Sequence, residues 1–88
     1  NDTMAIGCID EARGKHGLKV PEQISIVGFD GIHAAFWSGY ELTTIRQPVN
    51  QMAKAAVSIL MERIEHPEAP PEKRVLVGSL IRGTSARN

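Results

Sequence analysis

Two polar sites stand where ligand chemistry is expected in an α/β protein. Asp30 directly follows the apolar run Ile24–Phe29, and Asn1-Asp2 would follow a strand if an alternation of strands and helices extended upstream. Ligands of open α/β sheets bind just beyond the C-terminal ends of the strands. A carboxylate accepts hydrogen bonds and a carboxamide both donates and accepts them, so this pair could hold the vicinal hydroxyl groups of a sugar. The alternative is structural: Asn1 or Asp2 is only a helix cap, and Asp30 only a turn former beside Gly31.

Enzyme and metal chemistry find less support in the sequence. Cys8, His16 and His33 do not share the spacing of metal ligands, and no second cysteine accompanies them. Asp30, His33 and Ser38 would be the only hydrolase-like set, but the chain has no nucleophile elbow of the GxSxG kind. We therefore predict no catalytic residue, no metal site and no cofactor.

The elements that would position these residues begin with a helix from Asn1 or Asp2 to about Gly17. Gly17 supplies a left-handed stop, and Pro21 prevents the helix from continuing. Apolar residues at helical spacing predict its buried face, which comprises Met4, Ala5, Cys8, Ile9 and Ala12. The run Ile24–Phe29 is nearly all apolar and predicts a strand that is covered on both faces.

A second helix is predicted from Pro48, a favoured first helical residue, to Pro67, which ends it. Its predicted buried face comprises Val49, Met52, Ala53, Ala56, Leu60 and Ile64. Residues 43–45 favour a short extended stretch, and residues 75–81 one broken strand or two strands with a kink at Gly78. Helices that alternate with apolar strands indicate an α/β fold with an open, mostly parallel sheet flanked by helices.

The loop between the predicted strand and the second helix carries most of the aromatic residues. Phe36, Trp37 and Tyr40 lie there, in a stretch without helical or strand period. Three interpretations stay open: a local cluster that seals the loop against the core, a wall of a ligand site, or a subunit contact. Ile6 lies off the buried stripe of the first helix and favours a contact surface.

Composition excludes several classes of protein. Of the residues, 42% are apolar and 23% charged, and no apolar run approaches the ~20 residues that cross a membrane. Ten basic residues balance ten acidic ones without clustering, so we expect no direct contact with nucleic acid. A single cysteine cannot form an internal disulfide, which fits a reducing cytoplasm.

Three ordered motifs resemble those of the lactose-repressor/galactose-repressor family of transcription regulators. NDTMAIG at residues 1–7 is similar to the family's NDxMAxG, VPEQISIVGFD at residues 20–30 to VPxDISVVGFD, and LTTIRQP at residues 42–48 to LTTVRQP. The end of the chain, RGTS at residues 82–85, resembles the finish of the family's sensor domain. The resemblance covers the whole chain.

The resemblance implies a fold and a place in a larger protein. Members are cytoplasmic repressors with an N-terminal helix-turn-helix and a two-lobed sensor domain of the periplasmic-binding-protein-like type I. Residues 1–88 would be most of the C-terminal lobe, with the helix-turn-helix and the N-terminal lobe outside this chain. Implied partners are a small sugar or sugar derivative as effector, a second subunit in a homodimer, and operator DNA through the N-terminal domain alone, with no membrane.

The resemblance also assigns residues to roles. The effector would be held by Asn1 and Asp30 and lined by Gln47, Val49 and Met52, and the dimer interface would contain Ile6, Trp37 and Ser38. The alternative is the C-terminal lobe of a periplasmic sugar-binding protein that serves a transporter. A doubly wound enzyme is a third class, for which the sequence offers no catalytic pair at the strand ends.

Overall fold

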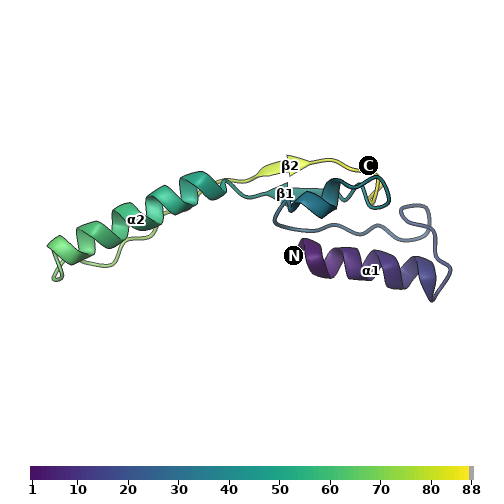
Figure 1. Ribbon diagram of the computed structural model, residues 1–88, viewed down its shortest axis with the longest axis horizontal. Helices are drawn as coiled ribbons and strands as arrows, with labels where there is room; N and C mark the ends of the chain where they lie inside the picture. The colour runs from purple at the N-terminus through teal and green to yellow at the C-terminus, as the bar shows by residue number, and fades with distance from the viewer. Residues whose placement is uncertain (88) are drawn as a thin grey trace. The chain divides into compact units, whose positions relative to one another are not determined.

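The computed structural model describes residues 1–87, which divide into two compact units. The first unit is formed by Asn1–Gln47 together with the segment from Ser79 onward, and the second unit is Pro48–Gly78. The elements labelled in Figure 1 follow the chain as α1, β1, α2 and β2. The chain thus passes from one unit to the other at Gln47–Pro48 and returns at Gly78–Ser79.

Helix α1 (Asp2–Gly14) confirms the first predicted helix. The Asn1 side chain accepts a hydrogen bond from the Met4 amide at 2.9 Å, and Gly17 has φ 61° in the left-handed region after the helix. The buried face is narrower than predicted, because Ala5, Ile9 and Ala12 are buried while Met4 and Cys8 are exposed. The two exposed residues lie at the edge of the stripe, where the described part of the chain provides no covering element.

The predicted strand at Ile24–Phe29 is wrong in detail. This segment makes only single parallel bridges, Val27 with Thr43 and Asp30 with Arg46, and it is not covered on both faces. Ile24, Val27 and Phe29 are exposed. The apolar run is therefore extended and paired along one side, and no second layer among the described residues buries its other face.

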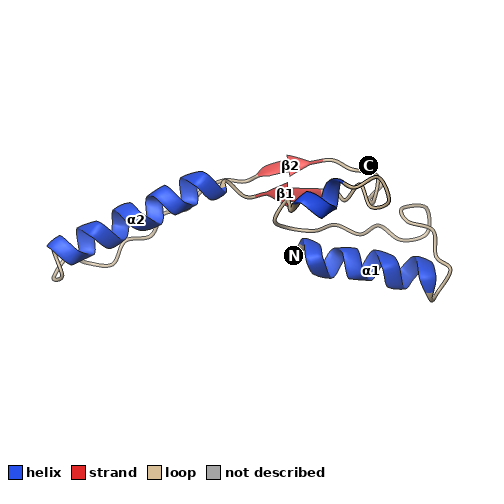
Figure 2. Cartoon of the chain, viewed as in Figure 1, coloured by secondary structure: helices blue, strands red, loops and turns tan. Residues whose placement is uncertain are grey.

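The sheet of the first unit joins two short strands, drawn in red in Figure 2. Strand β1 (Thr44–Arg46) pairs antiparallel with β2 (Ser79–Ile81), with Thr44 opposite Ile81. The extended stretch predicted at residues 43–45 is confirmed. An open, mostly parallel sheet is not present among the described residues, where parallel pairing is limited to the two single bridges.

A small core holds the first unit together. It is built from Ala5, Ile9, Ala12, Val20, Ala35 and Leu42. Ala35 lies in the short 3-10 helix η1 (His33–Phe36), which follows the turn at Asp30 and Gly31. Ile9 and Leu42 are completely buried, so α1, η1 and the segment before β1 are packed against one another.

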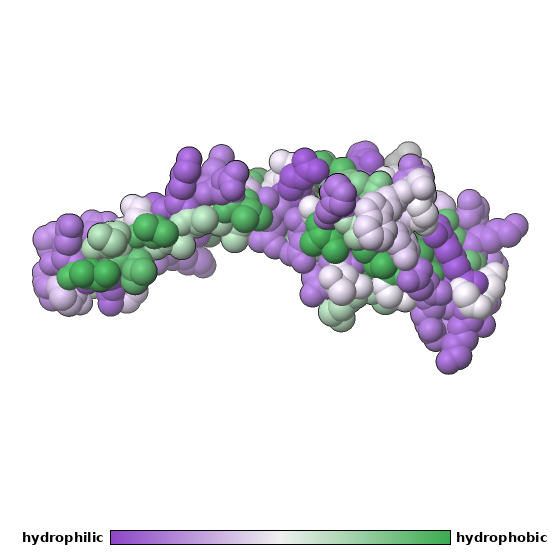
Figure 3. All heavy atoms as spheres, in the orientation of Figure 1, coloured by the Kyte–Doolittle hydropathy of each residue, from purple (hydrophilic) through white to green (hydrophobic). Residues whose placement is uncertain are grey.

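The second unit consists of α2 (Val49–Glu65) and the connector that follows it. The helix begins one residue after the predicted start at Pro48 and ends two residues before Pro67. The predicted burial of its apolar face is wrong, because none of its residues is buried within the described chain. Hydrophobic residues run along α2 in Figure 3. Leu60 of this helix is 59% exposed. Val75 and Val77 are exposed as well and lie outside β2. An amphipathic helix gains stability from a packed partner, and residues 48–78 do not provide one.

No helix among residues 1–87 has the length and apolar character that a membrane crossing requires.

Candidate functional site

Asp30 lies in a turn that both neighbouring elements hold in place. Its amide donates to the Ile45 carbonyl at 2.9 Å, and its carbonyl accepts from the Gln47 amide at 3.2 Å. These bonds place Asp30 beside β1, just after the extended segment that precedes it. The side chain is half-buried. Asp30 therefore lies at the end of the apolar segment, as predicted.

The backbone of this turn is strained. Asp30 has φ 146° and Gly31 has φ 78°, both in the region that favours glycine. A non-glycine residue held there costs roughly 1–3 kcal/mol, and such strain persists only where the surroundings over-determine it. Glycine is required at position 31, because a Cβ there would lie 2.9 Å from the Arg46 Cα. Strained residues cluster at ligand sites, so the strain marks the turn at Asp30 as a candidate ligand site.

The side chains of Asp30 and Gln47 meet. Gln47 Nε2 donates to Asp30 Oδ1 at 2.5 Å. The structure thus brings together two of the residues assigned by the resemblance. A carboxylate and a carboxamide side by side offer acceptors and donors to a polar ligand.

Asn1 has a visible structural role as the cap of α1. The Asp2 amide donates to the Phe29 carbonyl at 3.1 Å, so the start of α1 lies against the turn that contains Asp30. The capping bond uses one lone pair of the Asn1 oxygen, and a carboxamide has a second lone pair and two N–H donors. Capping and ligand contact are compatible at this position.

Asp2 is the residue of this region whose role the sequence does not reveal. It is completely buried, and its carboxylate accepts from the amides of Gly31 and Ile32 and from the Thr44 hydroxyl. The sequence presents Asp2, together with Asn1, as a candidate ligand residue or as a helix cap, whereas in the structure Asn1 is the cap and Asp2 is buried. One signal in the sequence could have indicated this role. Two adjacent polar residues, Asn1 and Asp2, open a helix that needs only one capping side chain, so the other side chain is free to bond elsewhere.

Val49 and Met52 belong to the second unit and are exposed, with Val49 at 65%. They lie in the first turn of α2, and their assignment to the ligand site stays a prediction.

The residues assigned to a dimer interface lie at the surface of the first unit. Trp37 is 56% exposed and Ser38 is exposed, while Ile6 is half-buried. The aromatic loop lies against α1, because Arg13 donates to the Gly39 carbonyl and the Tyr40 hydroxyl donates to Asp10 at 3.1 Å. The hydrogen bond to Asp10 is the main cause that raises the pKa of Tyr40 above its usual value.

The three interpretations of the aromatic loop separate by residue. Tyr40 packs against the core and seals the loop, as one interpretation predicts. Phe36 is partly covered by the Arg46 guanidinium, which lies 5.1 Å from the ring centroid. Trp37 remains largely exposed, which favours a contact with another molecule over a role in the core.

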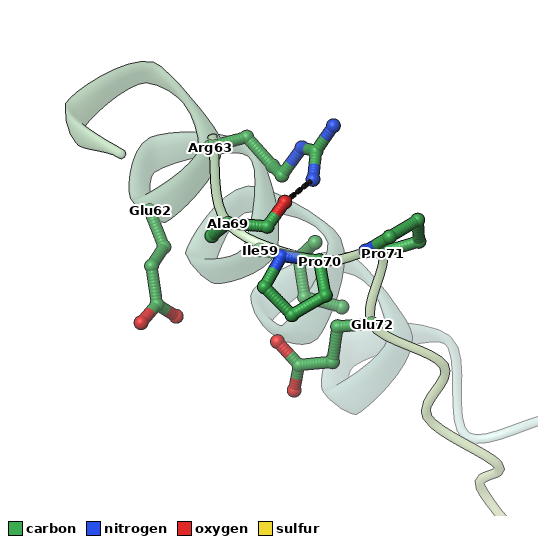
Figure 4. Close-up of a pocket in the computed structure, with 7 residues that line it drawn as sticks. All are labelled: Ile59, Glu62, Arg63, Ala69, Pro70, Pro71 and Glu72. Carbon is green, nitrogen blue, oxygen red and sulfur yellow. Dashed lines mark hydrogen bonds between the residues drawn. The ribbon is translucent and has the colours of Figure 1, made fainter. Parts of the chain in front are cut away.

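No group of three or more potential metal ligands occurs among residues 1–87. A pocket in the second unit, shown in Figure 4, is lined by Ile59, Glu62, Arg63, Ala69, Pro70, Pro71 and Glu72. Arg63, which lines the pocket, donates to the Ala69 carbonyl at 2.5 Å. It contains none of the residues predicted to hold a ligand.

Comparison with known proteins settles the family. The model of the periplasmic binding protein-like domain matches residues 1–86. The chain belongs to this family. The resemblance to lactose-repressor/galactose-repressor regulators is confirmed by its relatives, as is the periplasmic-binding-protein-like fold.

Among curated relatives, the "HTH-type transcriptional repressor PurR" of Vibrio campbellii is 47% identical over 75 residues, covering 85% of this chain and 22% of the relative. An HTH-type transcriptional regulator of Streptomyces limosus is 41% identical over 88 residues, covering 99% of this chain and 25% of the relative. The chain therefore spans about a quarter or less of the length of these relatives.

Solved structures agree. A LacI family transcriptional regulator from Enterococcus faecalis, with bound ribose, matches with a TM-score of 0.81 and 35% identity. The match covers 98% of this chain and 32% of the regulator's chain. A LacI-type transcription regulator from Bifidobacterium animalis matches with a TM-score of 0.84 and 30% identity. The match covers 100% of this chain and 31% of the regulator's chain.

Proposed function

We propose that the chain is part of the effector-sensing domain of a bacterial transcription repressor. The effector is a small sugar or sugar derivative that binds between two lobes, and its binding changes the affinity of the whole protein for operator DNA. The chain carries out no catalysis and binds no cofactor. Because a repressor acts on DNA, this proposal places the protein in the bacterial cytoplasm.

The observation that carries the proposal is the Asp30 turn. A strained acidic residue sits at the end of an extended segment and meets the Gln47 carboxamide at 2.5 Å. Both groups suit the hydroxyl groups of a sugar. Ribose in the regulator from Enterococcus faecalis supports this ligand class.

The first unit is the part that we assign to the C-terminal lobe of the sensor domain. It contains Asn1, Asp30 and Gln47, and we propose that these three residues contact the effector. Val49 and Met52, which open α2, are proposed to line the same ligand. The helix-turn-helix and the N-terminal lobe would belong to the rest of the longer protein.

The relatives favour a repressor over the lobe of a transporter's binding protein. Those from Vibrio campbellii and Streptomyces limosus are both named as transcription regulators of the helix-turn-helix type. The motifs at residues 1–7, 20–30 and 42–48 point the same way. A helix-turn-helix encoded upstream of Asn1 would support the repressor, and a secretory signal there would support the transport component.

The mechanism needs no covalent step. An effector shifts an equilibrium between two hinge angles only as far as it binds the two states differently, and such couplings are typically about 1–3 kcal/mol. In a dimer, two recognition helices must fit successive major grooves together, so a change of hinge angle becomes a change of operator affinity.

Calorimetry tests the site in the full-length protein. We expect Asp30→Ala to lower the affinity for D-ribose, or for the related pentose or hexose that binds best, at least tenfold, because a charge-assisted hydrogen bond is lost. His33→Ala, in the exposed first position of η1, is the matched control and should leave the affinity unchanged. Equal affinities of wild type and Asp30→Ala would remove Asp30 from the site.

Sedimentation tests the proposed homodimer. Trp37→Ala removes a large aromatic side chain that is exposed in the single chain. It should weaken the dimerisation affinity of the full-length protein at least tenfold, because tryptophans that a partner buries contribute strongly to binding. Val57→Ala removes a similarly exposed apolar group from α2 and serves as the control. A dimer unaffected by Trp37→Ala would contradict the assignment of this loop to the interface.

A further inference from the structure

Asp2 is a completely buried acidic residue that the proposed site does not use. Acidic side chains are rarely buried to this extent unless they are paired, because an isolated buried carboxylate is costly. Asp2 Oδ2 accepts from the Gly31 amide at 2.8 Å and from the Ile32 amide at 2.9 Å. Asp2 Oδ1 accepts from the Thr44 hydroxyl at 2.6 Å. All three donors lie close to Asp30 along the chain or along β1.

The bonds of Asp2 enclose the strained turn. Its backbone amide holds the carbonyl of Phe29, the residue before Asp30, at 3.1 Å. Its side chain holds the two amides that follow Asp30. One residue therefore fixes the chain on both sides of the position where φ is 146°. This is the kind of over-determination that a strained conformation needs.

Thr44 connects the same carboxylate to β1. Thr44 is almost completely buried, and β1 continues to Arg46, which bridges to Asp30. The next residue is Gln47, whose side chain bonds to the Asp30 carboxylate. Asp2 thus ties the turn that carries one polar group to the strand that leads to the other.

The space beside the carboxylate admits only glycine. A Cβ at Gly28 would overlap Asp2 Oδ1 and would come within 2.8 Å of the Leu42 side chain. The close approach of the extended segment to Asp2 therefore depends on the missing side chain at Gly28.

We propose that Asp2 is a positioning residue for the effector site: it holds the turn at Asp30 and Gly31 in its strained form, so that the Asp30 carboxylate stays beside Gln47. This inference rests on the proposed function, because Asp30 receives an effector only there. Asp2 itself touches no ligand. Its contribution to affinity acts through the backbone of residues 29–32.

The experiment compares four variants of the full-length protein with wild type. Asp2→Asn keeps the size of the side chain but replaces one acceptor oxygen with a donor. Thr44→Val removes the hydroxyl alone, and Thr44→Ser restores it. Ser85→Ala is the control: Ser85 is about as buried and bonds to the Ile26 carbonyl at 2.6 Å and the Thr43 amide at 2.9 Å, neither of which belongs to residues 29–32.

Two quantities are measured beside the melting temperature. One is the hydrogen exchange of the Gly31 and Ile32 amides, by mass spectrometry at residue resolution, and the other is the affinity for D-ribose by calorimetry. We expect Asp2→Asn to speed the exchange of both amides and to weaken ribose binding, each at least tenfold. Thr44→Val should weaken binding several-fold, and Thr44→Ser should restore it.

The control separates positioning from general stability. Ser85→Ala should lower the melting temperature while the exchange at Gly31 and Ile32 and the affinity stay at wild-type values. Wild-type exchange of these two amides in Asp2→Asn would overturn the proposal, as would losses of affinity that follow melting temperature alike in all variants. If Asp2→Asn does not fold, the Thr44 pair decides in the same way.

Failure of the proposed function has a different signature. In that case Asp30→Ala leaves ribose affinity unchanged, while Asp2→Asn still speeds the exchange at Gly31 and Ile32.

Discussion

Each unit of the chain contains a helix with apolar residues at helical spacing, but only the helix of the first unit has buried residues. The first unit buries Ile9 and Leu42 completely and satisfies a buried carboxylate with three hydrogen bonds. The second unit contains a longer helix, α2, with a regular apolar stripe and no buried residue within the described chain. A periodic apolar stripe therefore specifies a helix and its apolar face, but not the element that covers that face.

The largest difference between the units should appear on truncation of a leucine. Leu42→Ala removes a completely buried side chain and should lower the free energy of unfolding of the 88-residue chain by about 2–5 kcal/mol. Leu60→Ala, in α2, removes a side chain that is 59% exposed and should change it by less than about 1 kcal/mol. Urea denaturation followed by circular dichroism measures both. Equal losses would mean that the second unit has a core of its own.

A smaller contrast is expected at two serines. Ser85→Ala breaks the buried bonds to Ile26 and Thr43 and should cost about 1–3 kcal/mol, because two backbone groups lose a partner. Ser58→Ala lies in exposed α2 and should be neutral or stabilising by up to about 0.5 kcal/mol, since alanine is the better helix former. The same denaturation experiment gives both values. Effects of the same sign and size would remove the contrast between the units.

Local signals in the sequence were sufficient for the helices. Asn1 caps α1, Gly17 adopts the left-handed conformation after it, and Pro48 directly precedes α2. Each of these depends on a residue and its immediate neighbours, which is why the bounds of the helices could be predicted.

Burial could not be predicted in the same way, because it depends on partners far along the chain or outside it. The run Ile24–Phe29 reads as a buried strand, yet in the structure it pairs through single bridges and exposes Val27 and Phe29. Likewise, Met52 and Leu60 have the spacing of a buried helix face and are exposed.

The chemistry of the candidate site could be predicted, but the residue that supports it could not. The type and position of Asp30 indicated a polar ligand, the resemblance added Gln47, and in the structure the two side chains are in contact. The role of Asp2 depends on hydrogen bonds to Gly31, Ile32 and Thr44. These partners lie 29, 30 and 42 positions further along the chain, so no local pattern encodes the bonds. The strain at Asp30 is equally invisible, because aspartate is common in unstrained turns.

The role of Asp30 can be tested by a crystal structure of the full-length protein with its bound sugar. We expect an Asp30 carboxylate oxygen within about 3.2 Å of a ligand hydroxyl, with Gln47 beside it and the turn at Gly31 still bonded to Asp2. A sugar bound with no polar atom near Asp30 would contradict it.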